Sequence, residues 1–316
     1  MKKMIKVFSV IIAAAALCCT TGCAAVFQLA DLNNSYADSG LYTSGEREIS
    51  DEIDTLDIQW TSGKVVISQY DGDTVSFKES CAVSLSEKKQ VHSMVDRNGL
   101  HIRFTKSGER LKGKEKEKKL EVMIPKDMKL NEVELNGASC DYLLDGITSS
   151  HIATTSASGE CSLNDCSADT VALTGISGSI TVNLNNKAES IETNTTSGDI
   201  RINADTVKDV TVNTASGDVG MTLRSADSVS VHTVSGELDV AMEKEADEMR
   251  LESTSGEVTL SVPEKSDFTA ALHSVSGELD SELSLTKDGS KYICGSGKNS
   301  VIISTTSGDI KIRKHS

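Results

Sequence analysis

Acidic side chains recur at a fixed place in this sequence, two residues after the serine of a repeated Ser-Gly dipeptide. Eight of the ten units of the repeat carry Asp or Glu there. Hard divalent cations bind carboxylate oxygens, so one interpretation is a ladder of cation ligands. The candidate ligands are Asp199, Asp218, Glu237, Glu257 and Glu278.

A second interpretation of these acids requires no cation. Two unit charges about 5 Å apart in water repel by only ~0.8 kcal/mol, and salt weakens that repulsion further. A row of carboxylates can therefore persist on a surface, where the acids serve as turn residues that keep the chain soluble. The sequence assigns no metal site.

Eight cysteines and six histidines are the other residues that could do chemistry. No histidine cluster accompanies Cys161 and Cys166, so a zinc site is not expected. No histidine pairs with a serine or cysteine in a nucleophile motif. The sequence predicts no catalytic residue and no cofactor, and it leaves open one disulfide among Cys81, Cys140, Cys161, Cys166 and Cys294.

The Ser-Gly dipeptide sets the period of the chain. Successive copies stand 19 to 21 residues apart, and we call one such repeat a rung. Apolar residues fall six and four places before most of the serines and three and five places after them, which is the alternation of β-strands. The serines are Ser158, Ser177, Ser197, Ser216, Ser235, Ser255 and Ser276, with Ser139 one step before them and Ser307 after a longer gap.

A rung of about 19–20 residues with two short strands cannot bury its apolar face alone. Stacking of equivalent strands at ~4.8 Å solves this, because each inward side chain then rests on its counterpart. The glycine permits the bend between the strands, and Asn203-Ala204-Asp205 marks a second turn. The predicted fold is an all-β solenoid; antiparallel hairpins are the competing geometry, which the constant phase disfavours.

The two ends of the repeat are less regular. Residues 56–67 carry an echo of the rung, followed by hairpin-like strands with a turn at Asn98-Gly99. The run Lys112 to Lys119 is expected to be a solvated loop, and residues 289–300 a second irregular hairpin before a last rung, 301–312. We expect the segments 1–22 (signal), 23–45 (tether), 46–130 (irregular β cap) and 131–316 (solenoid).

The N-terminus has the features of an export signal. A basic start precedes 13 apolar residues, Val7 to Cys19, which are too few to cross a bilayer. The small residues before Cys23 resemble the bacterial lipoprotein signal. We expect lipidation of Cys23 and a membrane anchor facing outside the cytoplasm; cleavage after Ala25, or an uncleaved anchor extending to Ala30, stays open.

The recurring Thr-x-Ser-Gly-acid-aliphatic units resemble the bacterial putative-adhesin β-strand-repeat family, whose domains of unknown function are related to GIN-domain adhesin heads. Two such units are Thr195 to Ile200 and Thr305 to Ile310. The resemblance covers about residues 50–316. It implies a right-handed β-helix-like fold at the cell surface, and it brings no catalytic residues.

The composition and the rung lengths disfavour some classes of function. The formal net charge is −15 and only 3% of residues are aromatic, which disfavours nucleic acid as a partner. The central rungs vary in length by one or two residues, leaving little room for the loops of a β-helix polysaccharide lyase or hydrolase. We expect a non-enzymatic, envelope-tethered solenoid that binds a surface polymer or an envelope protein as an adhesin or scaffold. The alternatives are a signalling accessory of the envelope and, less favoured, the lyase or hydrolase.

Overall fold

The computed structural model describes residues 34–315. These residues are β-strands, turns and two short 3-10 helices, η1 (Glu87–Lys89) and η2 (Gly113–Lys116). Residues 34–185 and 186–315 form two compact units. The strand β12 (Ile180–Ser197) contains the division between them.

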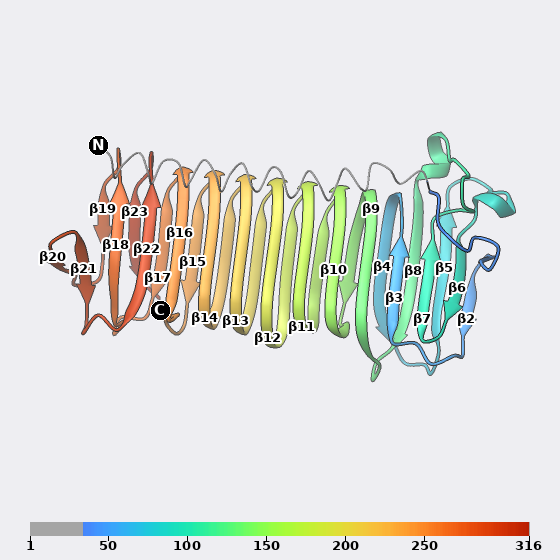
Figure 1. Ribbon diagram of the computed structural model, residues 1–316, viewed down its shortest axis with the longest axis horizontal. Helices are drawn as coiled ribbons and strands as arrows, with labels where there is room; N and C mark the ends of the chain where they lie inside the picture. The colour runs from blue at the N-terminus through green and yellow to red at the C-terminus, as the bar shows by residue number, and fades with distance from the viewer. Residues whose placement is uncertain (1–33, 316) are drawn as a thin grey trace. The chain divides into compact units, whose positions relative to one another are not determined.

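Parallel stacking of rungs builds the first unit (Figure 1). Ile152 pairs in register with Val133 on one side and with Val171 on the other, and all three side chains are buried. The strands of this unit are β1 (Thr43–Ser44), β2 (Arg47–Ile49), β3 (Thr55–Gln59), β4 (Ser62–Tyr70), β5 (Val75–Cys81), β6 (His92–Asp96), β7 (Gly99–Arg103), β8 (Lys118–Pro125), β9 (Lys129–Asp145), β10 (Thr148–Ser158) and β11 (Cys161–Ser177).

The bend between consecutive strands falls at the Ser-Gly dipeptide, as predicted. Gly178 has a φ of +117°, and a Cβ built on it would lie 2.0 Å from the carbonyl oxygen of Gly159 in the neighbouring rung. Gly217 repeats this approach against Gly198, at 2.2 Å. Only glycine combines a positive φ with so close a backbone contact.

The predicted second turn does not interrupt the strands. The strand β13 (Ile200–Ser216) runs through residues 203–205 and continues to pair there with β14 (Val219–Ser235), for example Ala204 with Leu223. Stacked rungs change direction together, so the hydrogen-bonded ladder follows the corner. Each central rung is therefore one long bent strand instead of the two short strands expected.

The order of rungs at the beginning of the chain differs from the sequence order. Strands β3 and β4 form the first rung, but they lie between β9 on one side and β7 with β8 on the other. The strands β7 and β8 thus supply the outer rung of this unit, where the sequence predicted ordinary hairpin strands over residues 100–104 and 120–125. A turn does join β6 to β7, but its two residues are Arg97 and Asn98, one place before the predicted Asn98-Gly99, because Asp96 pairs with Gly99.

Antiparallel strands cover that outer rung. The strand β6 pairs with β7 and β5 with β8, and the short strands β1 and β2 then pair with β6 and β5. An open edge of a sheet invites pairing with another chain, so these strands act as the expected cap.

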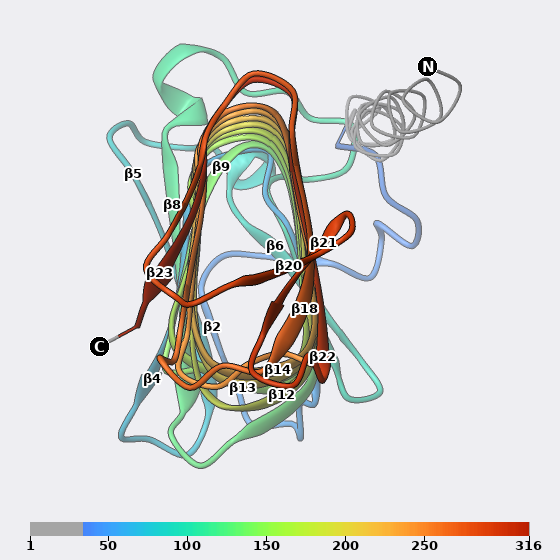
Figure 2. The ribbon, with the colours of Figure 1, turned by 90° about the vertical axis from the view of Figure 1, so that its left-hand side faces the viewer.

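The second unit is also a stack of parallel rungs (Figure 2). Its inward residues, such as Ile202, Met221 and Val240, are buried in register with one another. Its remaining strands are β15 (Leu238–Met242), β16 (Glu248–Ser255), β17 (Val258–Val262), β18 (Phe268–Ser274), β19 (Leu279–Ser281), β20 (Thr286–Asp288), β21 (Lys291–Cys294), β22 (Asn299–Thr305) and β23 (Ile310–Lys314).

The last rung of the sequence is not the last rung in space. Strands β22 and β23 lie between β16 with β17 on one side and β18 with β19 on the other (Figure 1). Val301, for example, pairs with both Met249 and Ala270. The predicted hairpin at 289–300 is the connection that brings the chain back, with β21 antiparallel to β20 and to β18. The predicted all-β solenoid is confirmed, and the expected order of its final rungs is wrong.

Candidate functional site

The acids after the Ser-Gly corners accept backbone hydrogen bonds. The N–H of Glu237 donates to Asp218 Oδ1 at 2.9 Å, and the N–H of Asp218 donates to Asp199 Oδ1 at 3.2 Å. Asp141 receives Glu160 N–H at 3.0 Å in the same way, and Asp309 receives Glu278 N–H at 2.9 Å. The carboxylate of one rung thus satisfies the amide of the next.

This arrangement gives the corner aspartates a structural role. Glu257 is engaged differently, since its Oε2 lies 2.6 Å from Lys311 Nζ. Within residues 34–315, no group of three His, Cys, Asp or Glu side chains is placed to hold a metal ion. The backbone ladder thus explains the four corner aspartates without a cation, whereas Glu237 and Glu278 enter it only as amide donors.

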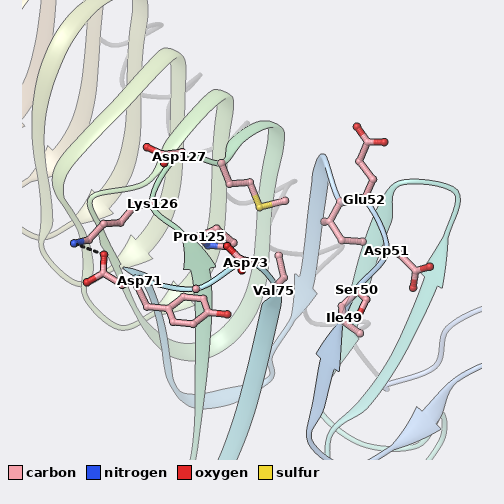
Figure 3. Close-up of a pocket in the computed structure, with 14 residues that line it drawn as sticks. Ile49, Ser50, Asp51, Glu52, Asp71, Asp73, Val75, Pro125, Lys126 and Asp127 are labelled. Atoms are coloured by element: carbon pink, nitrogen blue, oxygen red, sulfur yellow. Dashed lines mark ion pairs between the residues drawn. The ribbon is translucent and has the colours of Figure 1, made fainter.

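A hollow of about 660 Å³ in the first unit gathers five other carboxylates (Figure 3). Three loops form it, those that join β2 to β3, β4 to β5, and β8 to β9. The figure shows one pair of acids across the hollow from the others. The five are Asp51, Glu52, Asp71, Asp73 and Asp127.

One ammonium group offsets this charge in part. Lys126 Nζ lies 2.8 Å from Asp71 Oδ1, but both side chains are largely exposed, so the pair adds little stability. The floor is apolar, because Ile49 and Val75 are buried there. A concave site with an excess of four formal negative charges attracts cationic groups. The chemistry that this hollow supports is binding of an organic cation or a basic segment.

The sequence prediction missed a buried ion pair in the cap. Lys118 was expected in a solvated loop, yet its side chain is fully buried and pairs with Glu79, whose side chain is 8% exposed. Its ammonium donates to the carbonyls of Lys89, at 2.9 Å, and of Phe104, and lies 5.0 Å from the centre of the Trp60 ring. Burial lowers the pKa of Lys118 and raises that of Glu79. The alternation of Lys118 with the buried Leu120 was the available signal.

A second cluster fastens the start of the described chain to the cap. The guanidinium of Arg103 lies 5.8 Å and 5.6 Å from the ring centres of Tyr36 and Tyr42. Its Nη2 is 2.6 Å from Asp57 Oδ2, an oxygen that also lies 2.8 Å from His101 Nδ1. Burial raises the pKa of both tyrosines. Residues 34–45, expected as part of a tether, therefore lie against the solenoid.

The second unit has a comparable pair on its outer face. Glu252 lies 2.8 Å from His232 Nδ1 and 2.5 Å from Arg250 Nη2, and its side chain is 5% exposed. Burial raises the pKa of Glu252, but the hydrogen bonds from His232 and Arg250 outweigh burial, so that pKa lies below its ordinary value. This acid is held ionised, as expected of a structural ion pair.

The cysteines of the described chain are free thiols, so the disulfide left open by the sequence does not form among them. Cys161 and Cys166 are buried, and burial raises the pKa of each thiol to about 11. A thiol with that pKa is protonated at neutral pH and is a poor nucleophile. Cys23 lies outside the described residues. Within residues 34–315, no helix is both long and apolar enough to cross a membrane.

Comparison with known proteins identifies the fold family. The family model of Toastrack DUF4097 matches residues 53–313, whereas no curated protein matches the chain. A crystal structure of a "putative lipid binding protein" from Parabacteroides distasonis is 16% identical, with 86% of this chain and 97% of that chain covered and a TM-score of 0.50.

Two further solved structures match with lower structural scores. One is a "putative cell adhesion protein" from Clostridium sporogenes, 12% identical over 86% of this chain and 100% of that chain, with a TM-score of 0.26. The other is a "putative adhesin" from Bacteroides fragilis, 13% identical over 86% of this chain and 96% of that chain, with a TM-score of 0.37. The match to the family model confirms the predicted family of β-strand repeats with unknown function. The chain belongs to the Toastrack DUF4097 family.

Proposed function

We propose that the chain is a non-enzymatic scaffold of the cell envelope, tethered through a lipidated Cys23, that offers the outer faces of its solenoid to a surface polymer. The observation that carries this proposal is the regular stacking of the rungs. Strands β13 and β14 pair in register from Ile200 with Val219 to Ser216 with Ser235. Each outward side chain is therefore followed by its counterpart about 4.8 Å away.

Polar side chains stacked on these faces suit a repetitive ligand. Asn213 Nδ2 donates to Asn194 Oδ1 at 2.9 Å, so two neighbouring rungs present adjacent amides, and His232 follows Asn213 in register. A polymer with a repeating unit can contact several of these side chains at once, and multiple weak contacts add to a high overall affinity. This favours an adhesin or scaffold over a site that encloses one small molecule.

Several side chains that could do chemistry are already engaged in the fold. The corner aspartates accept backbone amides, as Asp218 does from Glu237. The buried thiols of Cys161 and Cys166 are held protonated. These features support the non-enzymatic part of the proposal.

Retention and cleavage of envelope polysaccharide, measured in one assay, test the proposal. Full-length protein is immobilised and incubated with the polymer; bound sugar and new reducing ends are then quantified. Binding without new reducing ends is expected. New reducing ends above those of a heat-denatured control would overturn the proposal, and absence of retained polymer would overturn its adhesive part.

The acidic hollow favours a second candidate, an accessory protein that docks a basic segment of an envelope protein. Asp51, Glu52, Asp73 and Asp127 are exposed, so their amide variants should fold. A partner captured from detergent-solubilised membranes should be lost from the variant D51N/E52Q/D73N/D127N. The matched control D209N/D227N/D247N/E248Q changes four exposed acids of the other unit and should keep it. Equal capture by both variants would reject the hollow as the docking site.

A further inference from the structure

Basic residues gather in the cap of this acidic chain. Residues 104–119 contain seven Lys or Arg against three Glu, although the whole chain has a net charge of −15. Lys118 is buried, but most of the others reach solvent. We call the exposed set the basic cap surface: Lys88, Lys106, Arg110, Lys112, Lys114 and Lys116.

Hydrogen bonds join the two segments that carry this surface. The N–H of Lys106 donates to the carbonyl of Lys88 at 2.9 Å. Lys89 Nζ lies 2.6 Å from Glu115 Oε1, and the buried Lys118 ties the carbonyl of Lys89 to β8. The exposed cations are therefore held together by the cap instead of being spread along a free loop.

The described chain begins on the same surface. Asn34 Nδ2 donates to the carbonyl of Lys106 at 3.0 Å, and the N–H of Gly108 donates to the carbonyl of Asn34 at 2.8 Å. Cys23 precedes Asn34 by eleven residues, which span at most about 40 Å when fully extended. A lipid on Cys23 would therefore keep this end of the unit within about 40 Å of the bilayer.

A hollow of about 400 Å³ opens beside Asn34. Arg110 and Lys116 line it with one opposing acid, Glu109, so the two cations outnumber the acid, and Ser62 and Ser139 add hydroxyl groups. Cationic and hydroxyl groups around a hollow are the donors that phosphate oxygens accept. The basic cap surface thus includes a recess of suitable chemistry for an anionic headgroup.

We infer that the basic cap surface lies against an anionic lipid bilayer, on the membrane that holds the tether. The inference rests on the proposed tethering through Cys23. Clusters of Lys and Arg close to an anionic bilayer are attracted to it electrostatically. The remainder of the mature chain is strongly acidic and is repelled by the same lipids, so the two effects together turn the cap toward the membrane.

Lysine acylation on vesicles tests this orientation. Full-length protein is reconstituted into vesicles of phosphatidylcholine, or of phosphatidylcholine with phosphatidylglycerol, and treated with a membrane-impermeant amine reagent. On the anionic vesicles, labelling of Lys106, Lys112, Lys114 and Lys116 should slow at least about threefold. The protection should disappear near 1 M salt, where the screening length is about 3 Å. Labelling of Lys208 and Lys265, in the other unit, should not change.

Two variants of equal charge provide the control. The variant K106Q/R110Q/K112Q/K114Q/K116Q should lose the protection from labelling on anionic vesicles. The labelling rate of Lys88, which is retained in this variant, reports the loss. The variant K187Q/K208Q/K244Q/K265Q/K287Q changes five exposed cations of the other unit and should keep the protection. Circular dichroism checks that both variants fold. The comparison of the two vesicle types uses only the wild-type chain, so it remains valid if a variant fails to fold.

The outcomes separate this inference from the tether on which it rests. Protein that sediments with both vesicle types but labels equally on both would overturn the orientation and leave the tether intact. Sedimentation with anionic vesicles alone would support the lipid contact and refute the acyl tether. Sedimentation with neither would refute both. Protection by a soluble anionic polysaccharide but not by anionic vesicles would identify a polymer ligand and overturn the inference.

Discussion

At four of the Ser-Gly corners, a backbone amide donates a hydrogen bond to an aspartate of the adjacent rung. Glu237 N–H meets Asp218 Oδ1 at 2.9 Å, and the same contact recurs at Asp141, Asp199 and Asp309. A hydrogen bond of this kind contributes about 0.5–1.5 kcal/mol to stability. The aspartates at this place therefore serve backbone hydrogen bonding, whereas Glu160 and Glu237 take part only as amide donors.

Paired substitutions at Asp218 distinguish the acceptor from the charge. We expect D218A to lower the free energy of unfolding by about 1 kcal/mol, because the amide of Glu237 loses its acceptor. We expect D218N to remain close to the wild type, since the amide oxygen accepts the same bond. Urea denaturation followed by circular dichroism measures both. Equal loss in the two variants would contradict the hydrogen-bond explanation.

The buried Lys118 holds the cap together from within. Its ammonium reaches Glu79 and two backbone carbonyls and lies 4.4 Å from the centre of the Phe104 ring. Removing one partner of a buried ion pair leaves an uncompensated charge and commonly costs about 3–5 kcal/mol. Removing both partners costs much less.

We therefore expect K118M to lower the melting temperature strongly and K118M/E79Q to recover a large part of the loss. Differential scanning calorimetry of the full chain measures both changes. The exposed neighbour variant K114M is the control, and it should melt near the wild type. A double variant as unstable as K118M would contradict coupling between the two side chains.

At both ends of the chain, the spatial order of the strands differs from their order in the sequence. In the first unit the first rung, β3 with β4, lies inside the outer rung. In the second unit the last rung, β22 with β23, lies inside the rung that precedes it in sequence. In both units a terminal rung is thus buried between two neighbours, which keeps its edges paired.

Engineered disulfides test the insertion of the last rung. The N–H of Thr306 donates to the carbonyl of Thr254, and the N–H of Ser276 donates to the carbonyl of Thr306, so the order is 254, 306, 276. Neighbouring rungs bring Cα atoms within disulfide range, whereas next-nearest rungs do not. We expect T254C/T306C to cross-link on mild oxidation and T254C/V275C to remain reduced, as read by mass spectrometry. The reverse result would restore the sequence order of rungs.

The proposed tether through Cys23 would connect the molecule to the membrane. Residues 34–45 lie against the cap through Tyr36, Tyr42 and Arg103, so the proposed spacer ends before Asn34. The proposed anchor at Cys23 then holds the cap near the bilayer while the basic cap surface orients it. A short spacer makes that orientation effective, because the ends of a short chain stay close.

Replacement of the proposed lipid attachment residue tests the anchor. We expect C23A to abolish incorporation of radiolabelled palmitate and to move the protein from the membrane fraction to the soluble fraction. C81A, which changes a cysteine of the cap, should leave both properties unchanged. Membrane retention of C23A would indicate an uncleaved N-terminal anchor, and palmitate incorporation by C23A would place the lipid elsewhere.

The sequence alone determined the solenoid. The alternation around residues such as Ile152 and Ile202, at one phase in every rung, has a single economical solution, which is parallel stacking with those side chains inside. The glycine of the Ser-Gly corner was also readable, because no other residue tolerates the positive φ and the close backbone contact seen at Gly178.

Only the tertiary structure decided which rungs are neighbours and which charges are buried. The apolar residues have the same phase in every rung. Val301 therefore fits between Met249 and Ala270 as well as it would fit beyond Ala270, and the periodicity does not distinguish the two strand orders. Lys118 reads as one more cation in a lysine-rich run, because its partner Glu79 comes from another strand. The local sequence pattern determines the conformation of each rung. Strand pairing between distant residues determines which rungs and which charged side chains become neighbours.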